Sequence, residues 1–83
     1  MGERFPAVTD KDVIKVLGKI DFEFYRQAKG SHEIWRRKND KKHTTLPRHP
    51  GKILKRRTLK SILCDIGLSI EGFKTILISR KSG

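Results

Sequence analysis

Apolar residues recur with a helical period near the start of the chain. The apolar residues that share one stripe there are Val13, Ile14, Leu17 and Ile20. Thr9 precedes the stripe and Asp12 follows Thr9 by three residues, the spacing of a capping box with Asp in place of the usual Glu. We therefore predict an amphipathic helix over residues 10–20 with Thr9 as its N-cap.

The last third of the chain returns to the helical period. The apolar positions of a second predicted helix are Leu59, Ile62, Leu63 and Ile66. Thr58 is predicted as its N-cap, and Gly67 as the left-handed residue that ends it. Ser69 is predicted to cap a final helix, whose inner face carries Phe73, Ile76 and Leu77.

Three short segments between the helical regions have the composition of strands. They are residues 22–26, which alternate and are rich in aromatics, residues 32–37, and residues 43–46. Pro47 and Pro50 are expected to end the third strand. The connections are short enough for hairpins, so we predict an antiparallel meander.

The order of these elements predicts the fold class. It is α+β, a three-stranded antiparallel sheet with helices on one face, in the order α-β-β-β-α plus a short C-terminal helix. With 83 residues, of which 35% are hydrophobic, the chain can build one modest core. We expect a single domain over residues 1–83 with its core at about 8–78.

Positive charge is concentrated in one stretch of the chain. The 20 Lys and Arg outnumber the 9 Asp and Glu, which gives a net charge of +11. Between Arg26 and Lys60, 13 basic residues stand against 2 acidic ones, so this stretch accounts for the whole excess. Like charges at this density repel one another in a small domain unless a polyanion lies against them. The distribution favours a nucleic-acid partner over a merely solvated surface.

Other features of the composition exclude several classes of protein. Cys64 is the only cysteine, so no internal disulfide can form, and we expect it to be half-buried in the second helix. No apolar run approaches the roughly 20 residues of a membrane span, and the first residues lack a signal peptide's apolar segment, so we expect a cytoplasmic protein. No Cys/His cluster has metal-ligand spacing and no Gly-rich nucleotide loop is present, so we expect no metal and no cofactor.

Histidine is the natural side chain for metal-free RNA cleavage. Internal attack requires a proton to leave a ribose 2′-OH and another to reach the leaving 5′-oxygen, and an imidazole exchanges protons near neutral pH. His32 is the favoured catalytic residue because it follows Gly30, where the backbone can approach a phosphate closely. The neighbouring residues expected to hold the scissile phosphate are Lys29 and Arg26.

The strand that carries His32 leaves two points open. Alternation puts His32 and Ile34 on one face, so either His32 lies at the strand edge beyond the core or Trp35 is the inward residue. Trp35 and Tyr25 can each stack on an unpaired base or pack against the sheet. The second proton-transfer group is open as well, because His43, His49, or a lysine acting with water can each serve.

Four motifs, in order, resemble those of one protein family. They are the helix start from Thr9 to Leu17, the turn from Arg26 to His32, the segment from Leu46 to Lys52, and the segment from Leu54 to Leu63 followed by Gly67, Leu68 and Ser69. Over about residues 8–78 the chain resembles the HicA toxins of bacterial and archaeal toxin–antitoxin pairs. These proteins have a fold like the double-stranded-RNA-binding domain.

The resemblance implies a function and a partner. It implies an mRNA interferase, a metal-independent endoribonuclease that cleaves mRNA with His32 as its essential histidine, and a HicB-type antitoxin protein that neutralises it. The residues expected to bind RNA are Arg26, Lys29, Gly30, Ser31, Lys52, Lys55, Arg56, Arg57 and Lys60. The alternative is a non-catalytic double-stranded-RNA-binding module on the same fold, which needs no proton carrier in the turn.

Overall fold

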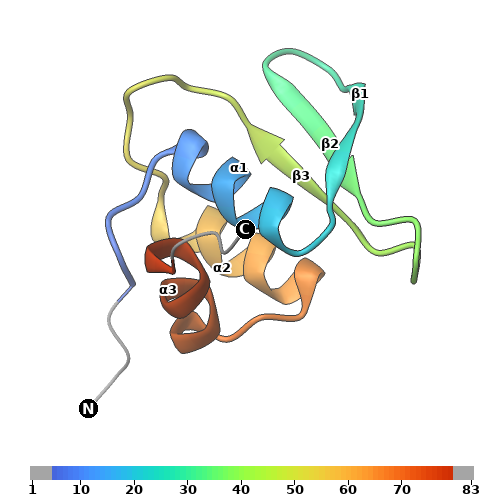
Figure 1. The fold of residues 1–83 in the computed structure, drawn as a ribbon. Coiled ribbons are helices and arrows are strands. Elements are labelled where there is room, and N and C mark those ends of the chain that lie inside the picture. Colours follow the sequence, from blue (N-terminus) through green and yellow to red (C-terminus); the bar gives the residue numbers. More distant parts are fainter. Residues whose placement is uncertain (1–4, 80–83) are drawn as a thin grey trace.

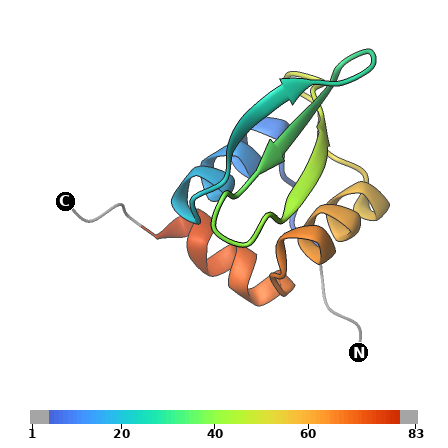
Figure 2. The ribbon, with the colours of Figure 1, turned by 90° about the vertical axis from the view of Figure 1, so that its right-hand side faces the viewer.

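The computed structural model describes residues 5–79, and it has two layers, a sheet and a group of helices that covers one face of the sheet (Figures 1 and 2). The elements in chain order are α1 (Asp10–Lys19), β1 (Glu23–Gln27), β2 (His32–Arg36), β3 (His43–Pro47), α2 (Arg56–Ile66) and α3 (Ile70–Ile78). The predicted α+β class and element order are confirmed. The predicted domain bounds, residues 1–83, extend past the described residues at both ends and stay a prediction. Among the described residues no helix is long and apolar enough to cross a membrane.

The sheet is the predicted antiparallel meander, with strand order β1-β2-β3. In the β2–β3 pair, His32 lies opposite Pro47 and Arg36 lies opposite His43. Pro47 is the last residue of β3 and not the first residue after it, because the final position of an edge strand tolerates a missing N–H. The pairing therefore places His32 at one end of the sheet and His43 at the other.

The predicted capping box at the start of α1 is confirmed. The Thr9 hydroxyl accepts a hydrogen bond from the Asp12 N–H at 3.4 Å, and the Asp12 carboxylate accepts one from the Thr9 N–H at 3.0 Å. Each side chain satisfies an amide that the helix itself leaves unpaired. The helix ends at Lys19, one residue before the predicted end.

Thr58 is not the N-cap of α2, so that prediction is wrong. The helix begins at Arg56, and Lys55 is the N-cap, with extended backbone and no side-chain hydrogen bond to the first amides. Arg56 and Arg57 are good helix formers, and the Leu59 N–H bonds to the Lys55 carbonyl at 3.0 Å, so the first turn forms ahead of the threonine. The basic residues before Thr58 are therefore part of the helix and not of the loop that leads to it.

The predicted end of α2 and start of α3 are confirmed. Gly67 has φ 76°, a left-handed conformation that costs a glycine little, and the Leu68 N–H bonds back to the Leu63 carbonyl at 3.0 Å. The Ser69 hydroxyl then accepts from the Gly72 N–H at 3.0 Å and caps α3.

The hydrophobic core lies between the sheet and the helices. Its buried apolar residues are Val8, Val13, Val16, Leu17, Phe22, Leu46, Leu59, Ile62, Leu63, Ile66, Ile70 and Phe73. Trp35 packs against this cluster and meets Phe24 edge-on, with ring centres 6.1 Å apart. Trp35 is thus the inward residue of β2, and by alternation His32 and Ile34 face away from the helices.

Cys64 is exposed, so the prediction that it is half-buried is wrong. Adjacent residues of a helix point about 100° apart, and Cys64 follows Leu63 toward the solvent side of α2.

Candidate functional site

His32 is the first residue of β2, and its side chain is exposed. Its ring Nδ1 lies 3.1 Å from the Lys29 carbonyl oxygen. A carbonyl oxygen only accepts hydrogen bonds, so this contact places a proton on Nδ1 and leaves Nε2 able to accept one. The turn therefore holds the imidazole in the tautomer that a general base needs.

The turn before His32 is braced by Gln27. The Gln27 amide donates to the Gly30 carbonyl at 3.2 Å and to the His32 carbonyl at 3.0 Å. Gly30 has φ 66°, and the position that its missing side chain would take is open space. The backbone conformation here favours glycine, and the space beside it is open to a ligand.

One groove brings several predicted site residues together. Its volume is about 320 Å³, and its lining residues are His32, Pro47, His49, Lys52, Ile53, Leu54, Lys55 and Thr58. We call it the His32 groove. His32 comes from β2. His49, Lys52 and Lys55 come from the loop between β3 and α2. Two imidazoles and two ammonium groups thus line a single space.

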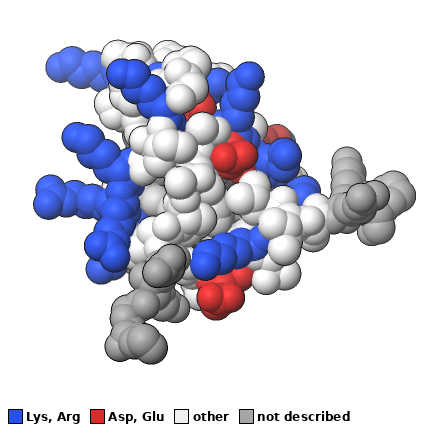
Figure 3. All heavy atoms as spheres, turned by 90° about the vertical axis from the view of Figure 1, so that its left-hand side faces the viewer, with Lys and Arg blue, Asp and Glu red and all other residues white. Residues whose placement is uncertain are grey.

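Basic side chains gather at the start of α2, beside this groove. They are Lys55, Arg56, Arg57 and Lys60, all of them exposed and, within residues 5–79, none of them ion-paired. The first turn holds no acidic residue, although positive side chains repel the positive end of a helix dipole. Free helix amides and unpaired cations together make an anion-binding surface. Figure 3 shows Lys and Arg side chains crowding one edge of the molecule.

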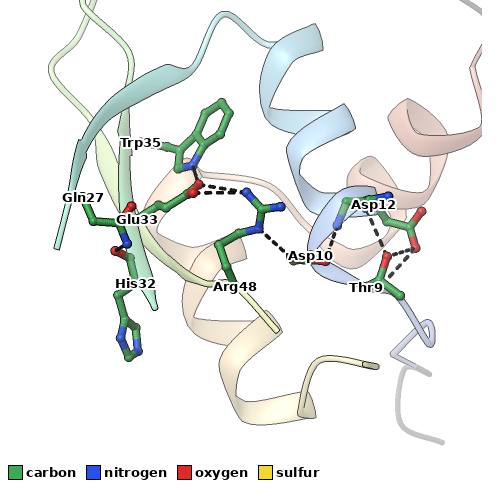
Figure 4. A network of polar contacts seen from close by, with 9 residues as sticks. Thr9, Asp10, Asp12, Gln27, His32, Glu33, Trp35 and Arg48 are labelled. Atoms are coloured by element: carbon green, nitrogen blue, oxygen red, sulfur yellow. Dashed lines mark hydrogen bonds and ion pairs between the residues drawn. The ribbon is translucent and has the colours of Figure 1, made fainter. Parts of the chain in front are cut away.

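Arg48 is a site residue that sequence reasoning missed (Figure 4). Its guanidinium donates to the carboxylate of Asp10 at the start of α1 and to that of Glu33 in β2, the latter at 3.1 Å. Its backbone N–H donates to the Ser31 carbonyl at 2.8 Å. Arg48 thus fastens the turn and the strand on both sides of His32 to α1. No sequence signal could have shown this, because the two carboxylates lie 38 and 15 residues away in the chain.

The pKa of Asp10 reflects this ion pair. The Asp10 side chain is 1% exposed, and burial by itself raises the pKa of a carboxyl group. Hydrogen bonds from Arg48 and from the Lys11 N–H outweigh that effect and hold the pKa of Asp10 below its ordinary value. The hydrogen bond to Asp10 in turn raises the pKa of Arg48. Both groups are therefore charged at neutral pH.

Three of the predicted site residues lie away from the His32 groove, within the strands of the sheet. His43 pairs with Arg36 at the far end of the strands, about 13 Å along β2 from His32 at the usual rise of a strand. Arg26 lines a different hollow at that far end. Trp35 faces the helices, and its indole N–H donates to Glu33 at 3.1 Å. Of the two alternatives for Trp35, the structure therefore shows packing against the sheet.

The lining residues of the groove do not include the other residues predicted to contact RNA, which lie in the turn before His32 or at the start of α2. Lys29 and Ser31 lie in the turn beside His32, and both are exposed. Among residues 5–79 no group of three or more His, Cys, Asp or Glu side chains is placed to hold a metal ion.

Comparison with known proteins identifies a family. A family model described as "HicA toxin of bacterial toxin-antitoxin" matches residues 11–68. The matched stretch runs from the first turn of α1 to just past α2 and includes the whole His32 groove. No curated protein matches the chain significantly.

Proposed function

Because the chain belongs to the HicA toxin family of bacterial toxin–antitoxin systems, we propose that it is an endoribonuclease that cleaves mRNA in the His32 groove. The observation that carries this proposal is the convergence of His32 and His49 with Lys52 and Lys55 on one space. A module that only binds RNA needs the lysines but has no use for an oriented imidazole.

The proposed chemistry is internal attack by a ribose 2′-OH. The Nε2 atom of His32 takes the hydroxyl proton, since Nδ1 is committed to the Lys29 carbonyl. The 2′-oxygen attacks the adjacent phosphorus, and the bond to the 5′-oxygen breaks. His49 lies in the same groove and is the proposed donor of a proton to that leaving oxygen. Lys52 and Lys55 stabilise the negative charge that builds up on the phosphate in the transition state.

The proposed RNA-binding surface extends from the groove along the start of α2. Its members are Lys29, Gly30, Ser31, Lys52, Lys55, Arg56, Arg57 and Lys60. Lys and Arg side chains contact the sugar–phosphate backbone without reading the bases, so these contacts place the strand and do not select its sequence.

A HicB-type antitoxin is the proposed protein partner. An acidic surface of the antitoxin that covers His32 and the start of α2 would exclude RNA, because it would pair with the same basic side chains that RNA contacts. Inhibition then needs no change in the fold, and the inhibited complex keeps the capping and core contacts described above.

Cleavage in the presence of EDTA is the direct test of the proposal. We expect the purified chain to cut single-stranded RNA in EDTA and to leave 2′,3′-cyclic phosphate and 5′-hydroxyl ends, the products of internal attack. The control is an RNA with a 2′-deoxy residue at the cut site, which lacks the attacking oxygen and must stay intact. Binding of RNA without any cleavage would favour the non-catalytic module, and cleavage that EDTA abolishes would overturn the metal-free mechanism.

A further inference from the structure

A second and larger hollow lies on the same sheet face as His32, at the opposite end of β2. Its volume is about 600 Å³, within the range of small-ligand sites. Its walls come from all three strands and from the β2–β3 turn, and the residues that matter below are Tyr25, Arg26, Arg36, Lys41 and His43. None of the helices formed by residues 5–79 covers this face of the sheet (Figure 2). We call this space the Arg36 hollow.

An arginine stacked on a tyrosine forms one wall of the hollow. The guanidinium carbon of Arg36 lies 3.9 Å from the centre of the Tyr25 ring, while Tyr25 itself is 48% exposed. Tyr25 and Arg36 thus present a stacked aromatic ring and guanidinium group at the hollow.

Positive charge in the hollow is only partly compensated. Within the described part of the chain, no Asp or Glu lines it. Two other lining residues are ion-paired, Arg37 with Asp40 at 2.8 Å and Lys38 with Glu23 at 3.8 Å. Within residues 5–79, Arg26, Arg36 and Lys41 form no ion pair. The free cations suit a phosphate, and the stacked tyrosine and guanidinium suit an unpaired base.

We propose that the Arg36 hollow binds one unpaired nucleotide, base and phosphate, of a single RNA strand that also passes His32. The proposal deepens the ribonuclease function and rests on it. By alternation His32, Ile34 and Arg36 lie on one face of β2, so a strand laid along β2 reaches both ends. The distance is about 13 Å at the rise of a strand, which a few nucleotides of extended RNA cover. The substrate class is therefore single-stranded RNA, held at a base a short distance from the cleaved bond.

A nucleotide fits these observations better than an acidic protein does. An acidic protein partner would supply carboxylates for the cations of the hollow but no planar base for the stack of Tyr25 and Arg36. A nucleotide offers the phosphate for the cations and a planar base for the stack. A duplex offers no unpaired base, so it cannot use the stack.

The test measures binding in a His32→Ala background, so that no RNA is cut during the measurement. Two variants remove different parts of the hollow: Tyr25→Leu removes the aromatic face, and Lys41→Asn removes a charge. Asn is chosen because Lys41 has φ 62°, a conformation that Asn tolerates. The matched control is Lys15→Gln, an exposed lysine of α1 in the helical layer.

We expect Tyr25→Leu to weaken binding of a single-stranded RNA of about eight nucleotides roughly tenfold, as loss of one stacked base does. Lys41→Asn should weaken it less, Lys15→Gln should leave it unchanged, and binding of a blunt RNA duplex should be insensitive to Tyr25→Leu. Wild-type affinity in both hollow variants overturns the proposal, as does an equal loss for single strand and duplex. A loss of antitoxin affinity with RNA affinity intact also overturns it and assigns the hollow to the protein partner.

The failures of the two proposals are distinguishable. Absence of RNA cleavage by the wild-type chain in EDTA contradicts the ribonuclease function, whereas the hollow is judged by binding to a variant that need not cleave. Because Lys41 lies in an exposed turn, its variant reports on the hollow even if Tyr25→Leu lowers the melting temperature.

Discussion

At its first residue β2 carries His32 next to a second histidine and two lysines, whereas at its last residue it carries Arg36 stacked on Tyr25. Both ends face the same side of the sheet, and both are basic. They differ in what surrounds the charge. The His32 end is joined to the start of α1 by the ion pair of Arg48 with the buried Asp10. The Arg36 end is joined to the other end of α1 by a hydrogen bond from the Arg37 guanidinium to the Ile20 carbonyl at 2.9 Å. In our proposals the first end orients groups for proton transfer, and the second holds a flat, negatively charged ligand.

The largest expected effect is on RNA cleavage, and it distinguishes His32 at one end of β2 from His43 at the other. His32→Ala should lower RNA cleavage by about 10²–10⁴-fold, the usual contribution of a general acid or base. RNA binding and the melting temperature should persist, because the binding rests on lysines and arginines and the His32 side chain is exposed. Cleavage rate, RNA affinity and melting temperature are measured on the same preparation.

His43→Ala is the matched control for that change, since His43 is an exposed histidine on the same pair of strands. Because His43 lines the Arg36 hollow and not the His32 groove, this change should lower the cleavage rate far less than His32→Ala does. An equal loss in both variants would contradict the division between the two ends, and wild-type cleavage by His32→Ala would refute the catalytic assignment.

The next effect tests how strongly the ion pair of Arg48 with Asp10 holds the His32 end to α1. Arg48→Met keeps the apolar stem of the side chain but leaves the buried Asp10 carboxylate without its partner. We expect a loss of about 3 kcal/mol in the free energy of unfolding, measured by chemical denaturation. Asp40→Asn breaks the exposed pair at the other end and should cost much less, because exposed pairs contribute little. Equal losses of unfolding free energy in the two variants would show that the ion pair of Arg48 with Asp10 stabilises the fold no more than an exposed ion pair does.

The ion pair of Arg48 with Asp10 also makes the stability of the fold depend on pH in the acid range. The pKa of Asp10 is lower in the folded chain than its ordinary value of 3.8, so the pair stabilises the fold fully above that value. The stabilisation is lost as the pH falls through the lower, folded pKa, where the carboxyl group takes up a proton. The melting temperature of the wild type should therefore fall from about pH 4 downward, and that of Arg48→Met should fall less. A parallel decline in both proteins would assign the acid sensitivity to other carboxyl groups.

The smallest expected effect concerns the start of α2, which lies beside the His32 groove. Replacing Arg56 and Arg57 together by Gln removes two exposed cations from the proposed RNA path. The slope of log affinity against log salt should become shallower by about 0.7 for each phosphate of single-stranded RNA that the double variant no longer neutralises. The matched control is Lys15→Gln in α1, and an unchanged slope in the double variant would remove the start of α2 from the binding surface.

Local signals predicted the helices well. The Thr9–Asp12 capping box, the left-handed Gly67 and the Ser69 cap all act between residues close in the chain, so the sequence contains both partners of each contact. Thr58 shows the limit of such signals. A suitable capping residue was present, but Arg56 and Arg57 continue a helix as readily as Thr58 starts one, and the helix formed earlier.

The candidate site was predicted only in part. His32, His49, Lys52 and Lys55 were named from the sequence, yet their meeting in one groove depends on how the β3–α2 loop returns to the start of β2. Gln27 and Arg48 were not recognised, because each acts through hydrogen bonds to residues whose proximity the fold creates.

By itself the sequence determined the order of the elements, their apolar faces, the excess of positive charge between Arg26 and Lys60, and the histidine of the Gly-Ser-His turn. Only the tertiary structure decided which face of β2 is covered. Alternation divides the strand into two sets of side chains but does not say which set meets the helices, and here the packing of Trp35 on the core turns His32 and Arg36 outward together. The structure also decided which charges remain free, because an ion pair forms between residues that are close in space whatever their separation in the chain.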